Sequence, residues 1–350
     1  MKSYKVVEFG QPLQKVEEAN PAPKGTEVLV RVTAAGVCHS DVHLWEGYFD
    51  MGGGNKYSTA KTMNPPRTMG HEIVGEVVSV GPDSKGAKVG AKAVVYPWIG
   101  CGKCWYCQGG TENLCPTPHA LGVNEDGGFA DHVLVPHAKY LYPYGNLPVE
   151  LACLYACSGI TAFGAVKKAV GHDGGKPILV IGAGGVGLMG VRFAKAVLGR
   201  EPIVADIDEN KRALALKNGA CAVVDPREKD SRKTLLELTG GTGVAAAIDF
   251  VGNEASAQFG WRALGRGGRL IVVGLFGGTF SVPLPMFAFT GNQIMGSVTG
   301  TPAEMKEMMD IVTAGKAEPV PVLRRKLDDA DVALQDLRKG LVMGRAVLMP

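Results

Sequence analysis

The segment Ile178-Leu179-Val180-Ile181-Gly182-Ala183-Gly184-Gly185-Val186-Gly187 joins an apolar run to a glycine-rich turn. Four apolar residues in succession predict a buried parallel strand, and the residues that follow predict a helix over Val186–Leu198. A Gly-x-Gly-x-x-Gly turn between a strand and a helix is typical of a dinucleotide site, where the helix N-terminus holds the pyrophosphate. Asp206 ends the next predicted strand and would accept the hydroxyls of the adenosine ribose. A carboxylate there repels a 2′-phosphate and no arginine follows it directly, so NAD is favoured over NADP.

The same pattern of strand, turn and helix continues on both sides of this segment. It predicts an α/β fold with a doubly wound parallel sheet in the middle of the chain. Residues 1–150 instead alternate short β-rich runs with Gly and Pro turns, which predicts a separate β-rich region. The predicted parallel strands are Pro177–Ile181, Pro202–Ala205, Ala246–Phe250 and Arg269–Val273, with a further helix over Glu209–Asn218. Elsewhere we expect strands at Glu27–Val32, Ile73–Val80, Lys92–Tyr96, Ala130–Pro136 and Arg345–Leu348, and a helix at Ala303–Ala314.

Composition limits the function classes. A chain of 350 residues favours two domains, and 46% hydrophobic with 20% charged residues is ordinary globular usage. A net charge of +3 is too small to indicate a nucleic-acid or membrane partner. The N-terminus has no apolar signal segment, and prolines interrupt the uncharged run Leu270–Ala303, which we expect to form buried strands joined by loops. We therefore expect a soluble, cytoplasmic protein.

Four of the eight cysteines form Cys101-x2-Cys104-x2-Cys107-x7-Cys115. In a reducing compartment such clustering indicates a metal, and four thiolates on a tight loop complete a closed tetrahedral zinc shell. One alternative is that the four cysteines are separate buried side chains that share no metal ion. An iron–sulfur cluster is a second alternative, although the spacing does not match the ferredoxin runs. The sequence therefore predicts a structural zinc site without an open position for catalysis.

A second, dispersed group of reactive residues lies in the motifs Gly36–His43, Gly70–Glu72 and Cys157–Gly159. Each motif alone is a weak signal, because a single Cys or His is usually packed or surface-exposed. Together they supply Cys, His and Cys, three protein ligands that leave a fourth position for water or substrate. This pattern is typical of catalytic zinc.

Taken together, these motifs resemble the zinc-dependent medium-chain alcohol dehydrogenases, above all the NAD-dependent prokaryotic and archaeal members, over essentially the whole chain. The resemblance implies a GroES-like catalytic domain from residues 1–156 and 296–350, with a structural zinc lobe at 98–117. It places a Rossmann NAD-binding domain at residues 157–295. It also implies two zinc ions per chain, one catalytic and one structural, and a homo-oligomer that is more often a tetramer than a dimer.

The resemblance also assigns roles to single residues. Cys38, His71 and Cys157 would bind the catalytic zinc, with Glu72 able to replace water on the metal and Asp41 orienting His71. Ser40 and His43 would relay the proton. The remaining expected NAD contacts are Gly182, Gly184, Gly185, Val186, Gly187, Asp206, Lys211, Thr161, His39, Gly274 and Arg345.

The resemblance implies reversible hydride transfer between a small alcohol and NAD, giving an aldehyde or ketone. Trp98 is the main predicted pocket wall, joined by Trp45, Leu121, the region Phe276–Val298 and a long loop over Gly47–Pro66. Two other function classes stay open: a zinc-free reductase acting on enones or quinones, and a non-catalytic zinc-lobe binding module. The first would lack the Cys38, His71 and Cys157 set, and the second would bind NADH without turnover.

Overall fold

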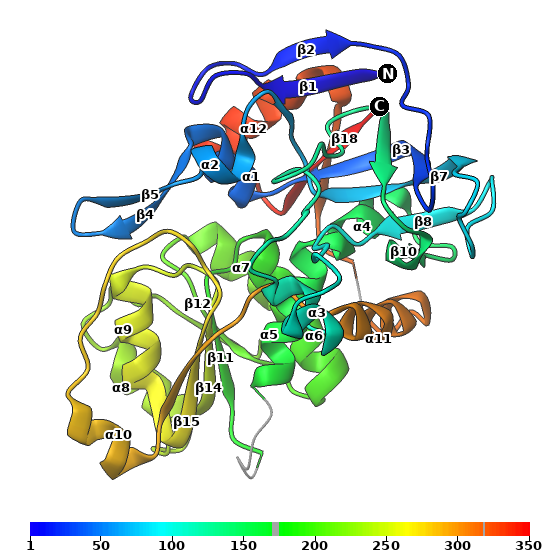
Figure 1. Cartoon of the computed structure of the whole chain (residues 1–350). Helices are drawn as coiled ribbons and strands as arrows, with labels where there is room; N and C mark the ends of the chain where they lie inside the picture. The colour runs from blue at the N-terminus through cyan, green and yellow to red at the C-terminus, as the bar shows by residue number, and fades with distance from the viewer. Residues whose placement is uncertain (170–174, 318) are drawn as a thin grey trace.

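The computed structural model describes residues 1–169, 175–317 and 319–350. The first and last parts of the chain form one β-rich region, and the central part forms a second region around a parallel sheet (Figure 1). Both chain ends lie in the β-rich region. The chain therefore leaves this region, builds the parallel sheet and returns to the β-rich sheet.

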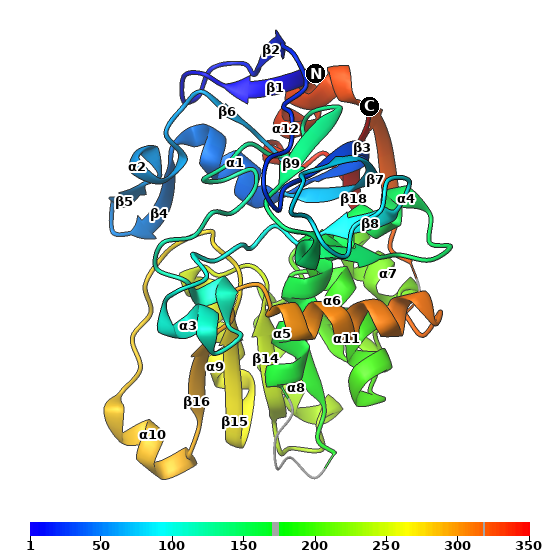
Figure 2. The same ribbon diagram turned by 45° about the vertical axis from the view of Figure 1, so that its right-hand side comes forward.

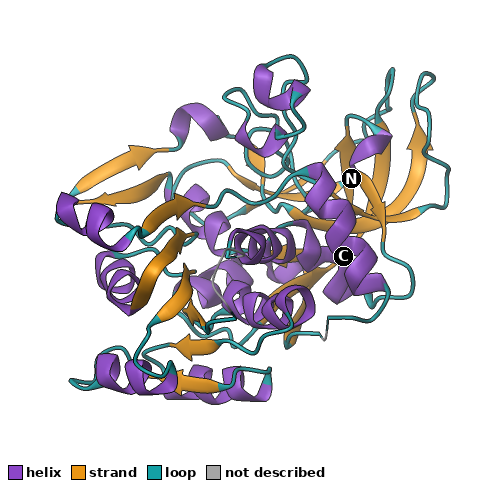
Figure 3. Ribbon diagram, turned by 90° about the horizontal axis from the view of Figure 1, so that it is seen from below, coloured by secondary structure: helices purple, strands orange, loops and turns teal. Residues whose placement is uncertain are grey.

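The central sheet has six parallel strands in the order β13-β12-β11-β14-β15-β16. Numbered along the chain from β11, this order is 3-2-1-4-5-6, in which ligands bind at the carboxyl ends of the strands where the order reverses. Apolar residues fill the central strands on both faces, because helices cover both sides (Figure 3). The strands are β11 (Ile178–Ile181), β12 (Ile203–Ala205), β13 (Ala222–Val224), β14 (Val244–Asp249), β15 (Leu264–Val272) and β16 (Gln293–Gly296).

The helices around this sheet begin and end at recognisable residues. Helix α6 (Gly185–Leu198) ends at Gly199, whose φ of 65° closes the helix in the left-handed conformation. Helix α7 (Glu209–Lys217) begins after Asp208, whose carboxylate accepts hydrogen bonds from the first turn. The other helices of this region are α5 (Ser158–Lys168), α8 (Ser231–Leu238), α9 (Glu254–Ala263), α10 (Leu284–Thr290) and α11 (Pro302–Thr313).

The β-rich region is built on a seven-stranded sheet with the order β10-β8-β7-β3-β18-β17, in which β9 also pairs with β3. Strand β3 pairs with β7 on one side and with the C-terminal strand β18 on the other, so both chain ends contribute to one sheet. These strands are β3 (Val28–Val37), β7 (Glu72–Val80), β8 (Lys92–Val95), β9 (His132–Val135), β10 (Leu141–Pro143), β17 (Val322–Lys326) and β18 (Arg345–Met349). A smaller sheet has the order β2-β1-β6 and contains β1 (Lys2–Val6), β2 (Gln14–Glu17) and β6 (Arg67–Thr68).

Short helical segments connect these strands. The α-helices are α1 (His39–Glu46), α3 (Trp105–Gln108), α4 (Val149–Ala152) and α12 (Ala330–Arg338), and the 3-10 segments are η1 (Glu112–Leu114), η2 (Ala138–Tyr140), η3 (Cys153–Ala156) and η4 (Leu327–Asp329). Among the described residues, no single helix has the length and apolar content of a membrane span. Two helical segments separated by a bend, Val149–Ala156 and Ser158–Lys168, have that length and apolar content only when they are counted together. This match rests on length and composition alone.

Two sequence expectations about local structure were wrong. The predicted loop over Gly47–Pro66 contains a hairpin of β4 (Tyr48–Gly52) and β5 (Asn55–Ser58), followed by α2 (Ala60–Met63). The glycines at positions 52–54 all have positive φ, which lets the chain reverse direction within three residues. The uncharged run Leu270–Ala303 was expected to be buried, but α10 within it has no buried residue and β16 is largely exposed.

Candidate active site and metal centres

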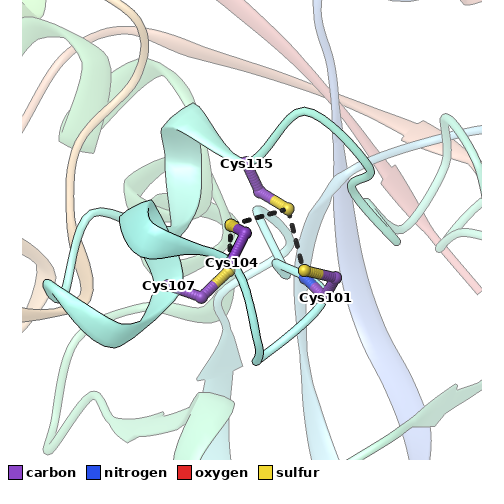
Figure 4. Close-up of side chains that lie close together, drawn as sticks. All are labelled: Cys101, Cys104, Cys107 and Cys115. Atoms are coloured by element: carbon purple, nitrogen blue, oxygen red, sulfur yellow. Dashed lines mark hydrogen bonds between the residues drawn. The ribbon is translucent and has the colours of Figure 1, made fainter.

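The four cysteines of the 101–115 loop point toward one another (Figure 4). Their sulfur atoms all lie within 4.8 Å of one another. The Cys104 sulfur is 3.4 Å from that of Cys107 and 3.8 Å from that of Cys115. A side chain at Gly100 would put its Cβ 2.4 Å from the Cys107 sulfur, so only glycine allows this wrapping. Four converging thiols without a water position suit structural zinc.

Glu112 ties this loop to the β-rich region. Its buried carboxylate accepts hydrogen bonds from Gly100 N at 3.2 Å, Tyr140 Oη at 2.6 Å and Lys139 Nζ at 2.8 Å. Although burial acts to raise the pKa of Glu112, the Lys139 and Tyr140 hydrogen bonds lower it. Backbone N–H groups, that of Lys103 first, lower the pKa of the Cys101 thiol to about 6. The shift of the Cys101 pKa favours the thiolate, which is the form of cysteine that binds a metal ion.

A second donor set forms where three distant segments meet. Cys38 follows β3 and precedes α1, His71 directly precedes β7, and Cys157 lies between η3 and α5. One donor atom from each lies within 4.8 Å of the others, and all three side chains are buried. Gly70 makes this approach possible, because a Cβ there would lie 2.2 Å from the Phe129 ring. The structure thus brings together the three ligands that the resemblance implied.

Asp41 fixes the orientation of His71. Its Oδ1 lies 3.1 Å from His71 Nδ1, and its Oδ2 accepts a hydrogen bond from Cys38 N at 2.9 Å. Although burial acts to lower the pKa of His71, the Asp41 carboxylate raises it well above its ordinary value. His71 Nε2 is buried and has no hydrogen-bond partner among the described residues. A buried, unpartnered imidazole nitrogen beside two thiols is the arrangement that a zinc ion completes.

Glu72 and Arg345 form a buried ion pair behind this donor set. Glu72 Oε1 also accepts a hydrogen bond from Ser158 N at 2.8 Å, so protein groups engage both carboxylate oxygens. Gly36 leaves the necessary space, since a Cβ there would lie 2.0 Å from Glu72 Oε2. The Arg345 side chain also packs on the glycine turn, where a Cβ at Gly185 would lie 2.1 Å from its Cδ. Arg345 therefore links the metal-ligand cluster to the glycine turn, although its guanidinium group points to Glu72.

The glycine turn has the geometry that its sequence pattern predicted. Gly182 has a φ of 88°, and a Cβ at Gly187 would lie 1.8 Å from the Gly182 carbonyl oxygen. A Cβ at Gly184 would meet nothing within 4 Å, so the space beside it is open. The Asp206 carboxylate accepts hydrogen bonds from Ala183 N at 2.7 Å and Asp208 N at 2.9 Å. The turn and the ribose-binding candidate are thus held together at the carboxyl edge of the sheet.

The other expected cofactor residues lie on neighbouring segments. Thr161 is in α5, and its buried hydroxyl finds no hydrogen-bond partner in the part of the chain that the structure describes. Gly274 follows β15 and packs on the backbone of Val251. Val186 is in the first turn of α6, and Lys211, which is half-buried, is in the first turn of α7. Thr161 offers the free hydrogen-bonding group that a polar cofactor would satisfy.

Ser40 and His43 lie on α1 beside the donor set. Ser40 Oγ is 3.2 Å from the Cys38 sulfur. The His43 ring centre lies 5.1 Å from that of Phe49, and the His39 ring centre lies 4.9 Å from that of Phe276. The sequence did not single out these two phenylalanines as ring partners: Phe49 lies six residues after His43 but on the hairpin strand β4, and Phe276 is far from His39 along the chain.

The hairpin β4–β5 reaches across to the central region (Figure 2). A Cβ at Gly52 would lie 2.7 Å from the Gly278 Cα, and one at Gly277 would lie 2.2 Å from the Asp50 carbonyl oxygen. Glycine on both sides therefore allows the backbone of the hairpin to contact the loop after β15. The segment expected to overhang the pocket forms this contact beside α1.

Of the expected pocket walls, Trp98 has a contact with the donor set. The Trp98 ring centre lies 5.3 Å from that of His71, so Trp98 borders the donor set. The Trp45 ring is buried, and its Nε1 donates to the Gln11 carbonyl oxygen. Leu121 is likewise a core residue, only 2% exposed. The sequence named these apolar side chains without any information about which way they face.

A cavity of about 650 Å³ lies elsewhere, beside the cysteine loop and strand β9. Its lining includes His119 and His132, which pair with Glu125 at 3.0 Å and with Asp131 at 2.9 Å. These histidines already have acidic partners. The metal-ligand clusters and the glycine turn, rather than this cavity, therefore mark the candidate active site.

Comparisons with known proteins agree with this geometry. Residues 24–146 match the family described as alcohol dehydrogenase GroES-like domain, and residues 185–314 match zinc-binding dehydrogenase. The chain is 37% identical to an NAD-dependent alcohol dehydrogenase of Sulfurisphaera tokodaii and 38% identical to one of Saccharolobus solfataricus, covering 100% of each chain. It superposes on the crystal structure of the alcohol dehydrogenase of Aeropyrum pernix with a TM-score of 0.88, at 34% identity over 100% of both chains. The predicted combination of a GroES-like and a Rossmann domain is confirmed.

Proposed function

Because the chain belongs to the zinc-dependent medium-chain alcohol dehydrogenases, we propose that it transfers a hydride reversibly between an alcohol and NAD, giving an aldehyde or ketone. The observation that carries this proposal is the convergence of Cys38, His71 and Cys157, with the Ser40 hydroxyl beside the Cys38 sulfur. The relatives from Sulfurisphaera tokodaii and Saccharolobus solfataricus are NAD-dependent alcohol dehydrogenases.

The two donor sets fit two zinc ions per chain. Cys101, Cys104, Cys107 and Cys115 would hold a structural zinc, and Cys38, His71 and Cys157 would hold a catalytic zinc with one position open. When bound, the catalytic zinc supplies Lewis acidity that lowers the pKa of an alcohol oxygen, and NAD accepts the hydride. Glu72 remains our candidate for a transient fourth ligand, and Trp98 for a wall of the substrate pocket.

The protein's own groups would move the hydroxyl proton. Ser40 is placed to accept it, because its hydroxyl lies 3.2 Å from the Cys38 sulfur. His43 lies three residues further along the same helix and is only half-buried, so it can pass the proton to solvent. Burial lowers the pKa of His43, which keeps the imidazole neutral and able to accept a proton near neutral pH.

The cofactor would lie along the carboxyl edge of the parallel sheet. The turn from Gly182 to Gly187, including Gly184, Gly185 and Val186, would hold the pyrophosphate at the N-terminus of α6. Asp206 would accept the adenosine ribose hydroxyls, with Lys211 beside it. Thr161 and Gly274 would contact the nicotinamide half, and His39 and Arg345 would add positive charge toward the pyrophosphate.

Zinc content and turnover test the proposal together. We expect two zinc ions per chain in the purified protein and NADH production with a panel of primary, secondary and aromatic alcohols. In Cys38→Ser we expect one zinc per chain, no turnover, and NADH binding close to that of the parent. Full activity in this variant would falsify the zinc assignment. One zinc per parent chain without turnover would instead favour a binding module.

We further propose a homo-oligomer, with a tetramer preferred over a dimer. Within residues 1–169, 175–317 and 319–350, no strand pairs with the outer edge of β16, and its Ile294 is 40% exposed. Leu284 and Phe289 of the neighbouring α10 are 80% and 67% exposed. A free strand edge beside exposed apolar side chains is a surface on which another chain can pair and pack. Light scattering of the parent and of Ile294→Lys should show a lower mass for the variant, and equal masses would exclude this edge from the interface.

We propose the domain limits 1–156, 157–295 and 296–350. Strand β16 ends the parallel sheet at Gly296, and β17 and β18 then rejoin the β-rich sheet.

We also propose a cytoplasmic location. All eight cysteines are free, and two metal-ligand clusters that depend on thiols suit a reducing compartment. Cell fractionation of the native host would test the location, and limited proteolysis would test the limits.

A further inference from the structure

Asp225 connects two arginines to the turn that carries Asp206. Asp225 follows β13 and Asp206 follows the neighbouring β12, and these strands pair with Ala205 opposite Val224. The two carboxylates therefore lie at the same carboxyl edge of the sheet, where ligands of this fold bind. Asp206 N also donates to the Val224 carbonyl oxygen at 3.2 Å, which joins the two strand ends directly.

Both guanidinium groups contact Asp225 and a backbone carbonyl oxygen of the Asp206 turn. Arg227 Nε and Nη2 donate to the two carboxylate oxygens of Asp225 at 3.1 and 2.7 Å, and Nη2 also donates to the Ile207 carbonyl oxygen at 2.6 Å. Arg212 Nη1 donates to Asp225 Oδ2 at 3.0 Å and to the Asp206 carbonyl oxygen at 2.8 Å. The two arginines thus fix the turn that holds the ribose-binding carboxylate.

The two arginines differ in exposure. The Arg212 side chain is only 17% exposed, whereas the Arg227 side chain is 64% exposed. Arg227 is thus held by three hydrogen bonds, yet most of its surface faces solvent. Ile207, whose carbonyl oxygen it contacts, is also 56% exposed. A planar cation that is fixed in advance and open to solvent, next to an exposed apolar side chain, is suited to bind a flat aromatic ring.

We propose that Arg227 binds the adenine base of NAD, with its guanidinium plane stacked on the ring and Ile207 beside it. The inference rests on the proposed NAD binding at Asp206. The adenine base is bonded to the ribose that would meet Asp206. Since Ile207 directly follows Asp206 and its carbonyl oxygen contacts Arg227, the base would lie within reach of both side chains. Since the hydrogen bonds to Asp225 already hold the side chain, little conformational entropy is lost on binding.

The charges of this cluster favour an adenine base over a 2′-phosphate. Two carboxylates, Asp206 and Asp225, balance two guanidinium groups, Arg212 and Arg227. Arg227 forms a two-contact pair with Asp225, so its charge is largely neutralised. The flat face of the guanidinium is what remains available to a ligand.

Binding measurements on four proteins test the proposal: the parent, Arg227→Ala, Arg227→Lys and the control Arg232→Ala, which removes an exposed arginine from α8 in the same region. The probes are NADH, 5′-AMP, nicotinamide mononucleotide and 2′,5′-ADP, measured by fluorescence or calorimetry. In Arg227→Ala we expect the Kd for NADH and for 5′-AMP to rise about three- to tenfold, as loss of a cation–π contact implies. The Kd for nicotinamide mononucleotide should stay unchanged, which also shows that the variant is folded.

The lysine variant separates stacking from charge. Arg227→Lys keeps the charge without the planar group, and we expect it to bind 5′-AMP as weakly as the alanine variant. Full affinity in either variant, or a parent that binds 2′,5′-ADP more tightly than 5′-AMP, would overturn the proposal. A parent that binds nicotinamide mononucleotide and 5′-AMP but not NADH would contradict NAD binding itself. Unchanged NADH affinity in Arg227→Ala refutes only the role of Arg227.

Discussion

Replacing Asp41 by Asn should weaken zinc binding at the catalytic site while leaving the cysteine loop filled. The Asp41 carboxylate faces two donors, His71 Nδ1 at 3.1 Å from Oδ1 and Cys38 N at 2.9 Å from Oδ2. An Asn side chain has only one acceptor oxygen, and its amide group can only donate. One of the two donors would therefore face another N–H group in a site where Asp41 and His71 are completely buried.

The size of the effect follows from the role of the contact. Loss of a partner that orients a metal-binding histidine typically costs about 10- to 100-fold in metal affinity or activity. This corresponds to about 1.4–2.8 kcal/mol of zinc binding free energy. Because both contacts of Asp41 hold zinc ligands, either loss would displace a ligand from the common centre.

A chelator titration followed by zinc analysis measures this effect. In the parent we expect two zinc ions per chain over a wide range of chelator concentration, and in Asp41→Asn a loss of one zinc at about 10- to 100-fold lower chelator concentration. The zinc of the cysteine loop serves as an internal reference. Asp230→Asn, an exposed position, is the matched control. Equal chelator midpoints for the parent and Asp41→Asn would refute the reasoning.

Three further predictions concern the cofactor turn, the proton path and the cysteine loop. Gly184→Ala should have the melting temperature of the parent, since the added Cβ meets no atom within 4 Å. Its Kd for NADH should rise at least about tenfold, because the added methyl group prevents the close approach of the pyrophosphate to the backbone. An unchanged Kd would contradict this. His43→Gln should slow alcohol oxidation by up to about 100-fold, with partial recovery in imidazole buffer. Burial lowers the pKa of His43 below 6.5, so the imidazole is neutral at and above pH 6.5. The ratio of parent to variant rates should therefore stay constant at and above pH 6.5 and decrease only below it. A ratio that already decreases above pH 7 would disprove the assignment. Cys115→Ser should lose one zinc per chain and lower the melting temperature by at least about 5 °C, with zinc analysis and circular dichroism as the readouts; full zinc content would argue against the site.

Local patterns in the sequence were enough to predict much of the fold. The strand, glycine turn and helix around Gly182 were predictable because each depends on residues adjacent in the chain. The four cysteines from Cys101 to Cys115 lie within one loop, so their spacing alone indicated a common centre. The predicted strands near Glu27, Ile73, Lys92 and Ala130 correspond to β3, β7, β8 and β9. Helix α11 appears within one residue of its predicted limits, and its Met305, Met308 and Met309 are buried.

The tertiary structure decided how distant segments meet. The resemblance named Glu72 and Arg345 for separate roles, but only the pairing of β3 with β7 and β18 shows that they form one buried ion pair. The hairpin β4–β5 was mistaken for a loop because its turn needs three consecutive positive φ values, which glycine permits but does not require.

The sequence by itself determined the fold class, the cysteine loop and the glycine turn, because the residues that define them are close along the chain. The orientation of Trp45 and Trp98 depended on which side chains pack around them, and a pattern of apolar residues does not specify direction. The contacts of Arg227 were also beyond the sequence, since Ile207 lies twenty residues away and meets it only where two strands end side by side. Parallel strands bring distant residues to one edge, and the neighbours that meet there are set by strand order and register.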